Sequence, residues 1–309
     1  MSGSAGRLHT RAALARLLPA EHTPTPFALT DLFARDLDQY AEIIVGPGGH
    51  PAGFMTRGEG PEFTERGRVA LEQLGLPEAA LAHHDRLSEL FEHRRAFLKI
   101  EWHVGDAGVE PMAACYFRRR PSVTTVADHL AAWGVSEKAL ALTYDVAGAL
   151  EKASVHFVAA AFRPGQPVWH KLYFSQLVAP DTRDQVSARI ARVFQRFRIT
   201  GEALAHWRAH HDSMLPDGES SLFVSVSFSN QAIMPSFKID YPDVPAHRVA
   251  AWLPAEQQAR AVADAGDACA LGGTKTVTFL GVRFQVDRVT PSLKYYCDVP
   301  VAEALPWRS

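Results

Sequence analysis

The sequence is poor in cysteine and has no excess of charge of one sign. Its 309 residues include three cysteines, Cys115, Cys269 and Cys297, without CxxC or Cys/His spacing. The absence of such spacing excludes a zinc module and a disulfide framework. It favours a reducing compartment, and we expect the protein to lie in the cytoplasm. Lys and Arg number 32 against 34 Asp and Glu, a formal charge of -2. That balance argues against a protein that coats nucleic acid, which normally carries a basic excess.

Long hydrophobic runs are also missing. No apolar stretch approaches the roughly 18 residues that a membrane-spanning helix needs, so we expect a soluble protein without a membrane partner. The chain is nevertheless 47% hydrophobic and 21% charged, a composition that can bury a large core and is unlike that of disordered proteins. Its length fits one domain of barrel size or two unequal ones.

One pattern of strands and helices recurs along the chain. Two alternating runs of β-branched and aromatic residues, separated by a turn rich in Gly, Pro or Asn, predict a β-hairpin. Clear hairpins are predicted within residues 97–300, at 97–119, 154–177, 221–241 and 275–299, with amphipathic helical stretches between them. A weaker first hairpin is predicted at 39–57, after an N-terminal helical segment of about residues 1–38.

The repeat predicts the architecture. Five units of strand, strand, helix, helix, each of about 60 residues, account for the whole length. Consecutive hairpins joined by helix pairs form a meandering antiparallel sheet that can close on itself. We therefore predict one domain over residues 1–309, an α/β fold with an antiparallel ten-stranded β-barrel inside an outer ring of helices.

A lysine recurs in the second strand of three units: Lys171 in HKLY, Lys238 in FKID and Lys294 in LKYY. Residues two apart in a strand share a face. In VWHKLYFSQL the face without the lysine is the more apolar, so that face should pack under the helices. The lysines would then face the barrel lumen, where a cluster of cations suits a multivalent anion. The alternative is that each lysine points to solvent, as most strand lysines do.

These features together resemble a known family. The ββαα repeat and the segments HKLYFSQL, FKIDY and LKYYCDV are similar to the ABBA-type aromatic prenyltransferases, which include enzymes for phenols, indoles and cyanobactin peptides. The resemblance covers about residues 97–300. It implies a PT barrel that moves a dimethylallyl or longer prenyl group from an allylic diphosphate to an aromatic or other electron-rich acceptor (a small molecule, an amino acid or a peptide) in natural product biosynthesis.

The resemblance also implies roles for lumen residues. Cations would bind the diphosphate, and tyrosines would shield the carbocation from water. In the second unit Ala114 stands where the other units have lysine, so Arg118 would supply the missing cation. The implied diphosphate ligands are Lys171, Lys238, Lys294, Arg57 and Arg118, and the implied shield is Tyr116, Tyr173 and Tyr296.

Asp240 departs from the family pattern, because it stands where a tyrosine often follows the lysine. It would pair with Lys238, bind a magnesium ion or contact the acceptor. The family contains both metal-dependent and metal-independent members, so Mg²⁺ is a possible cofactor and no other cofactor is implied.

Transfer to an aromatic ring also requires a base. Indole prenyltransferases use a glutamate on the first strand of a hairpin, which makes Glu101 and Glu42 the candidates by residue type. Glu101 shares a face with Lys99 and His103, so a plain ion pair is an equally good interpretation. Two rival functions are a non-catalytic barrel that binds an apolar ligand with an anionic group, and a terpene-type lyase. The DDxxD motif of such lyases is absent from the sequence.

Overall fold

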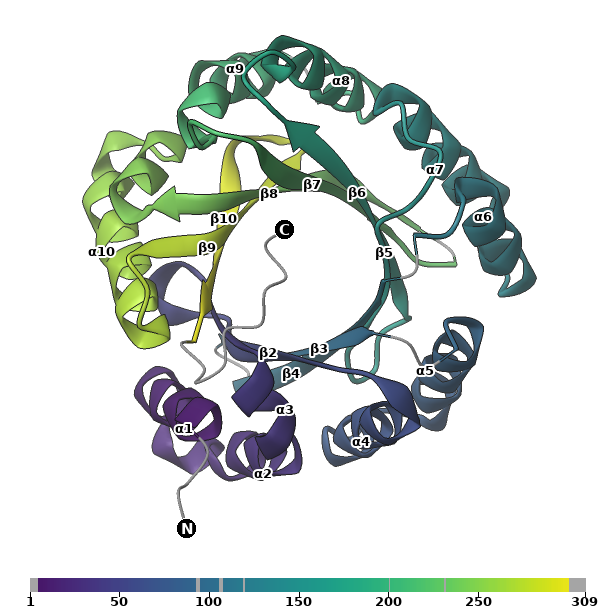
Figure 1. Cartoon of the computed structure of the whole chain (residues 1–309), viewed down its shortest axis with the longest axis vertical. Helices are drawn as coiled ribbons and strands as arrows, with labels where there is room; N and C mark the ends of the chain where they lie inside the picture. Colours follow the sequence, from purple (N-terminus) through teal and green to yellow (C-terminus); the bar gives the residue numbers. More distant parts are fainter. Residues whose placement is uncertain are drawn as a thin grey trace.

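The chain forms a closed antiparallel β-barrel, as predicted, in a computed structural model that describes residues 5–299 apart from 93–94, 106–107, 119, 200 and 231. Each strand pairs with its neighbours in the chain, and β1 closes the barrel against β10 (Figure 1). The strands are β1 Ala41–Val45, β2 Ala52–Gly58, β3 Ala96–Gly105, β4 Gly108–Phe117, β5 Phe157–Phe162, β6 Trp169–Val178, β7 Ser220–Phe228, β8 Ile233–Pro245, β9 Thr276–Gln285 and β10 Arg288–Asp298.

Helices cover the outside of the barrel between successive hairpins (Figure 1). The α-helices are α1 Ala5–Leu17, α2 Pro24–Leu32, α3 Ala34–Gln39, α4 Gly60–Gln73, α5 Glu78–Leu90, α6 Val123–Ala132, α7 Glu137–Ala149, α8 Arg183–Arg196, α9 Glu202–Met214 and α10 Ala255–Gly272. After β8 the chain has a 3₁₀ segment, Ala246–Trp252, followed by α10. Pro254 directly precedes α10, and its missing N–H and fixed φ favour the start of a new helix there.

The weakly predicted first hairpin is confirmed as β1 and β2. Glycine is unfavourable inside a strand, but the presence of Gly53 in β2 has a structural reason. A Cβ atom at Gly53 would lie 2.2 Å from the carbonyl oxygen of Ile100 on β3. The glycine therefore permits the close approach of β2 to β3.

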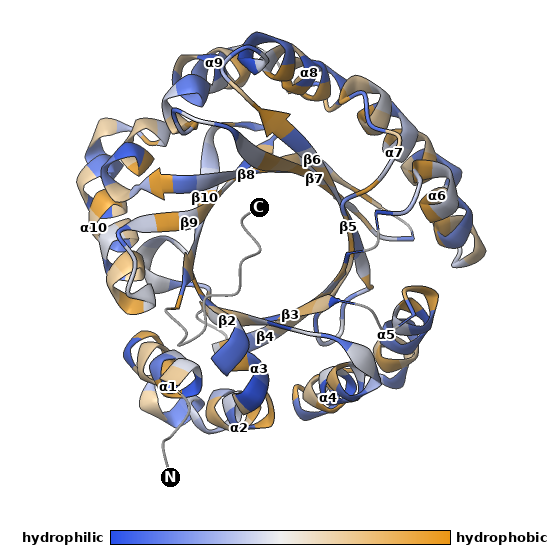
Figure 2. Cartoon of the chain, viewed as in Figure 1, coloured by the Kyte–Doolittle hydropathy of each residue, from blue (hydrophilic) through white to orange (hydrophobic). Residues whose placement is uncertain are grey.

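Strand alternation separates two buried environments. The outward face packs under the helices in one large hydrophobic core, and Figure 2 shows hydrophobic residues interspersed with hydrophilic ones along the strands. Ala159, Ala161, Tyr116 and Tyr173 form a separate cluster on the inner face. Ala160, between Ala159 and Ala161, belongs to the outer core. Its parity in the strand is opposite to that of its neighbours.

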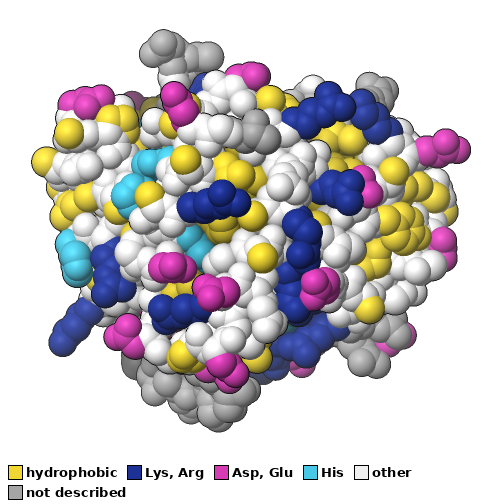
Figure 3. Space-filling model, turned by 90° about the horizontal axis from the view of Figure 1, so that it is seen from above, with side chains coloured by type: hydrophobic (Ala, Val, Ile, Leu, Met, Phe, Trp, Pro, Cys, Tyr) yellow, Lys and Arg dark blue, Asp and Glu magenta, His cyan; other side chains and the backbone are white. Residues whose placement is uncertain are grey.

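The outer surface carries charges of both signs, and Figure 3 shows Asp and Glu among the Lys and Arg side chains of one face. Within the described ranges, no helix has the length and apolar character needed to cross a bilayer.

Candidate active site

The lumen residues are arranged in layers because successive strands are staggered by one residue. Tyr116 on β4 is in register with Ala159 on β5, and Ala159 is in register with Lys171 on β6. The ring of Tyr116 nevertheless contacts the ring of Tyr173, which lies two residues beyond Lys171 on β6. The same offset recurs around the barrel among the inward-facing phenylalanines described below. Equivalent positions of successive units therefore lie at one height in the barrel. We call the barrel end with the β-turns the hairpin end and the opposite end the helix end.

Tyr116, Tyr173 and Tyr296 form the tyrosine layer. The ring centroids of Tyr116 and Tyr173 are 5.6 Å apart, and the Lys238 ammonium lies 5.6 Å from the Tyr173 centroid and 5.2 Å from that of Tyr296. By register and stagger, Asp240 takes the corresponding place on β8. Burial raises the pKa of the Tyr116 and Tyr296 hydroxyls well above the ordinary value, so both remain neutral.

The lysine cluster lies next to this layer, towards the hairpin end. It consists of Lys99, Lys171, Lys238, Lys294 and Arg283, whose charges act on one another. The predicted lysines thus face the lumen and meet there. Lys99 and Arg283 join them although the repeat of lysines did not point to either.

Two carboxylates lie within the lysine cluster. Glu101 is fully buried and accepts hydrogen bonds from Lys294 Nζ at 2.9 Å and from Lys99 Nζ at 3.0 Å. Burial acts to raise the pKa of Glu101, but the two lysines hold it well below the ordinary value. Asp240 lies 2.7 Å from Lys238 Nζ, as the pairing alternative predicts, and raises the pKa of that lysine against the effect of burial.

Lys171 differs from the other lysines of the cluster. It alone among them has no hydrogen-bond or ion-pair partner within the described part of the chain. Burial and the neighbouring cations hold its pKa well below the ordinary value. Five cations and two carboxylates leave the cluster with an excess of three positive charges when all are ionised.

A cavity of about 950 Å³ reaches the lysine cluster from the hairpin end. Three residues of the lysine cluster line its wall, namely Lys171, Lys294 and Arg283. Other polar and aromatic side chains of the wall are His103, Trp169 and Arg163. An anion entering from this end meets Lys171 and Arg283 on the cavity wall.

Four phenylalanines form the next layer, on the helix side of the tyrosines. Centroid distances are 5.6 Å for Phe97–Phe157, 5.8 Å for Phe157–Phe223 and 5.9 Å for Phe223–Phe279. Each ring comes from the first strand of a hairpin, and each is half-buried. On β1 the corresponding position is Glu42, so a single carboxyl completes this phenylalanine layer.

Glu42 is fully buried, and its surroundings differ from those of Glu101. The Tyr40 hydroxyl donates a hydrogen bond to Oε1. Asp298 is its register partner on β10. Burial and the neighbouring Asp298 raise the pKa of Glu42 well above the ordinary value.

Arg57 and Arg118 lie at the helix end, away from the lysine cluster. Their guanidinium carbons are 5.2 Å from the Tyr40 centroid and 6.0 Å from the Phe157 centroid, respectively. Arg118 is four residues beyond Ala114, the position on β4 that corresponds to Lys171, which is about 13 Å along a strand. The structure therefore does not bring these arginines together with the three lysines that were predicted to share a diphosphate with them.

The phenylalanine layer, Asp298 and Tyr40 were missed from the sequence. A signal was present, because Phe97, Phe157, Phe223 and Phe279 recur at intervals of about 60 residues, at one place in the first strand of each unit. Glu42 occupies that place in the first unit.

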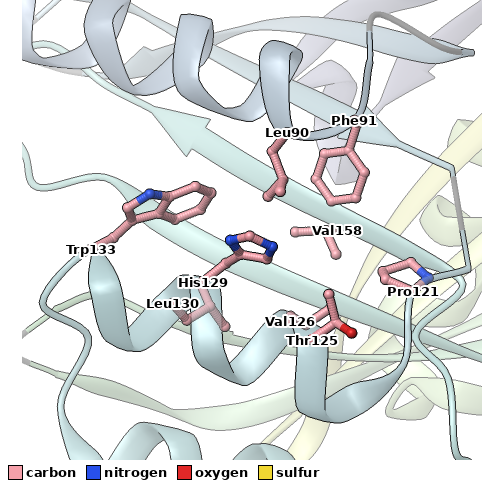
Figure 4. Close-up of a pocket in the computed structure, with 9 residues that line it drawn as sticks. All are labelled: Leu90, Phe91, Pro121, Thr125, Val126, His129, Leu130, Trp133 and Val158. Carbon is pink, nitrogen blue, oxygen red and sulfur yellow. The ribbon is translucent and has the colours of Figure 1, made fainter.

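A second cavity of about 250 Å³ lies outside the barrel wall, between α5 and α6 (Figure 4). Its wall is mainly apolar and comprises Leu90, Phe91, Pro121, Thr125, Val126, His129, Leu130, Trp133 and Val158. It does not share residues with the lumen layers.

The architecture and lumen define a PT barrel, the ABBA fold of aromatic prenyltransferases, and comparison with solved structures confirms the fold. The chain is similar to 6-dimethylallyltryptophan synthase from Micromonospora olivasterospora in complex with DMASPP and Trp (16% identity, 96% and 97% of the two chains, TM-score 0.59). It is also similar to 5-dimethylallyltryptophan synthase from Streptomyces coelicolor (15%, 96% and 98%, 0.56) and to NotF in complex with brevianamide F and DMSPP (12%, 95% and 92%, 0.61). No protein-family model and no curated protein sequence matches the chain.

Proposed function

We propose that the protein transfers a prenyl group from an allylic diphosphate to an aromatic or other electron-rich acceptor. The observation that carries this proposal is the order of layers in a closed lumen: lysine cluster, tyrosine layer, then phenylalanines with one carboxyl. This order matches a donor whose head is anionic and whose tail is an incipient carbocation. It also matches an acceptor that is flat and apolar and loses a proton.

The lysine cluster is suited to the leaving diphosphate. A diphosphate ester carries about three negative charges near neutral pH, which equals the charge excess of the cluster. As the C–O bond breaks, its electron pair stays on the diphosphate, and buried ammonium groups stabilise that charge. Lys171 is the first cation that we assign to the diphosphate, because no carboxylate in the described ranges pairs with it. Lys294 and Lys238 contribute from their ion pairs with Glu101 and Asp240.

The tyrosine layer separates the diphosphate from the acceptor. Its π faces stabilise the allylic cation and exclude water that would quench it. The acceptor ring then lies among the four phenylalanines and forms the new bond to the prenyl carbon. The proton displaced from the acceptor goes to Glu42, the carboxyl of that layer, with Asp298 beside it. Glu101 is not suited to this step because two lysines keep it ionised and weakly basic.

Magnesium has few protein ligands near the lysine cluster. Asp240 is held by Lys238 at 2.7 Å, and among the described residues no three His, Cys, Asp or Glu side chains form a group that suits a metal. We therefore assign neutralisation of the diphosphate mainly to the lysines and expect turnover to continue in the presence of EDTA.

The experiment mixes the protein with dimethylallyl or geranyl diphosphate and a panel of phenols, indoles and short peptides. Acceptor-dependent diphosphate release and a product heavier by one prenyl group are expected. Donor binding without release would instead favour the non-catalytic alternative, a barrel for an apolar ligand with an anionic group.

The matched variants are Lys171→Ala in the lumen and Lys138→Ala on the exposed face of α7. Losing one charge-assisted hydrogen bond costs about 1.5–3 kcal/mol. Lys171→Ala should therefore raise the KM for the donor at least about tenfold. Lys138→Ala should leave it unchanged. An unchanged donor KM in Lys171→Ala would contradict the assignment of the diphosphate to this cluster.

A further inference from the structure

The second cavity, of about 250 Å³, lies where the ring of helices opens between α5 and α6 (Figure 1, Figure 4). Its wall includes Val158 of β5, which is buried and belongs to the outer hydrophobic core. The chain neighbours of Val158, Phe157 and Ala159, belong instead to the cluster on the inner face of the barrel. Strand β5 therefore separates this cavity from the lumen, and a molecule bound in it lies outside the space assigned to prenyl transfer.

The walls of this cavity are mainly apolar. Leu90 and Phe91 lie at the end of α5 on one side. On the other side, the wall consists of Val126 and Leu130 of α6 and of Trp133, which directly follows that helix. None of the described residues around the cavity is a Lys, Arg, Asp or Glu. A charged ligand would lose its hydration here without gaining an ion pair, which is unfavourable, so the cavity suits a neutral and mainly apolar molecule.

His129 is the polar group in the middle of the cavity. Figure 4 shows its imidazole ring, which comes from α6, directed into the space between the two helices. The ring centroid lies 6.4 Å from that of Trp133, and within the described ranges no group shares a hydrogen bond with the imidazole. The Thr125 hydroxyl, also on the wall, already shares a hydrogen bond of 2.7 Å with Ser122. A ligand that fills the cavity can therefore gain a hydrogen bond with His129.

The volume and the aromatic walls indicate the shape of the ligand. An apolar cavity of about 150 Å³ is large enough to bind benzene, so this larger cavity accommodates roughly two fused rings. Phe91 stacks on Phe117 of β4, with ring centroids 5.3 Å apart and an interplanar angle of 12°. This contact holds Phe91 in place as part of the wall, and aromatic rings pack favourably on one another in offset or edge-to-face arrangements. A flat bicyclic aromatic molecule fits these features.

We propose that this cavity is a second ligand site, which binds a neutral bicyclic aromatic molecule through a hydroxyl group hydrogen-bonded to His129. A hydroxyl group both donates and accepts, so it can pair with the imidazole whichever ring nitrogen carries the proton. The apolar walls stabilise the complex by removing the rings from water. The site goes beyond the proposed function, because binding in it requires neither a prenyl diphosphate nor turnover.

The first experiment locates the ligand. Crystals soaked with 6-bromo-2-naphthol should show an anomalous bromine peak between α5 and α6, beside the His129 ring. An aromatic molecule can also enter the lumen, so a peak in the lumen alone overturns the proposal. The same ligand binding in the crystal without a matching event in solution is binding at crystal concentration only, and it also overturns the proposal.

The second experiment measures the site in solution by titration calorimetry with 2-naphthol. Val126→Phe fills the cavity from α6, so one binding event of the unmodified protein should be lost. The matched control is Val286→Phe, which adds the same ring at an exposed position and should retain that event. Identical titrations for Val126→Phe and the unmodified protein would show that 2-naphthol binds elsewhere, and the proposal would be wrong.

The third experiment tests the role of His129 and remains decisive if Val126→Phe does not fold. His129→Leu should weaken 2-naphthol binding at this site about three- to tenfold, the contribution of one neutral hydrogen bond. Binding of 2-methylnaphthalene, which lacks the hydroxyl, should be unaffected. The control His247→Leu, at an exposed position, should change neither affinity. If His129→Leu weakens both ligands equally or leaves both unchanged, recognition of a hydroxyl by His129 is refuted.

Discussion

Glu42 and Glu101 are both fully buried in the lumen, but the barrel gives them opposite environments. Glu101 lies between the ammonium groups of Lys99 and Lys294, which keep it ionised. Glu42 has a tyrosine hydroxyl on one oxygen and a second carboxyl, Asp298, on the neighbouring strand. Two carboxyls so placed titrate as a pair, and one of them keeps its proton above the pH at which an ordinary carboxyl loses it. Such a group is the stronger base once ionised.

The pair predicts the acid side of the pH profile. Prenyl transfer should fall as pH decreases through the raised pKa of Glu42. Asp298→Asn removes the neighbouring negative charge, so the pKa of Glu42 should fall and the acid limb of kcat should move to lower pH. Glu42→Gln should reduce kcat by about 10²-fold or more without a matching rise in donor KM.

Glu101→Gln is the comparison for this prediction. It leaves the carboxyl pair intact, so it should change donor KM but not the position of the acid limb. The assignment of the base to Glu42 is contradicted if Asp298→Asn leaves the acid limb in place, or if Glu101→Gln moves it.

At the scale of elements, much of the arrangement follows from the repeat. The hairpins, the five units and the direction of Lys171, Lys238 and Lys294 are predictable because strand parity and helix coverage decide which face is inside. The contacts that each of these side chains makes in the lumen cannot be predicted from the repeat. Lys294 meets Glu101 across the lumen, although the two residues are 193 positions apart in the sequence. This contact depends on the one-residue stagger between neighbouring strands, and the alternation of residues within one strand does not predict that stagger.

The stacking of helices on the barrel depends on polar contacts as well as on apolar area. Tyr241 points outward from β8, opposite in parity to Lys238, and is fully buried. Its hydroxyl accepts a hydrogen bond from Trp207 Nε1 at 3.0 Å and lies 2.9 Å from His211 Nδ1, both on α9. This contact joins α9 to the barrel wall behind the lysine cluster.

Tyr241→Phe should therefore destabilise the fold. It removes the acceptor of a buried indole N–H, and an unsatisfied buried donor costs about 1–3 kcal/mol. The midpoint of urea denaturation should fall, while Tyr144→Phe, at an exposed position on α7, should leave it unchanged. Equal midpoints for the two variants would show that α9 is held by apolar packing alone.

At the scale of the whole molecule, barrel closure makes the lumen an electrostatic unit. Pairing of β1 with β10 brings the first hairpin, with Glu42, against the last, with Lys294 and Asp298. Cations and carboxylates from five hairpins then share one enclosed space of low dielectric constant, where the protonation of each group depends on the others. A multivalent anion bound at the cluster would stabilise the charged form of its lysines.

The enclosed charge predicts the basic side of the pH profile. Burial and repulsion by Lys294 and Lys238 lower the pKa of Lys99 to about 7, against the attraction of Glu101. As pH rises through 7 towards 9, Lys99 loses its proton, and the excess of positive charge in the cluster becomes one unit smaller than when all five cations are charged. The affinity for a non-hydrolysable thiolodiphosphate donor analogue, measured by calorimetry, should fall roughly tenfold, about 1.4 kcal/mol. In Lys99→Met the affinity should be lower at pH 7 and should depend less steeply on pH, because one titrating group of the cluster is gone. A pH dependence as steep in Lys99→Met as in the unmodified protein would show that another cation of the cluster titrates in this range.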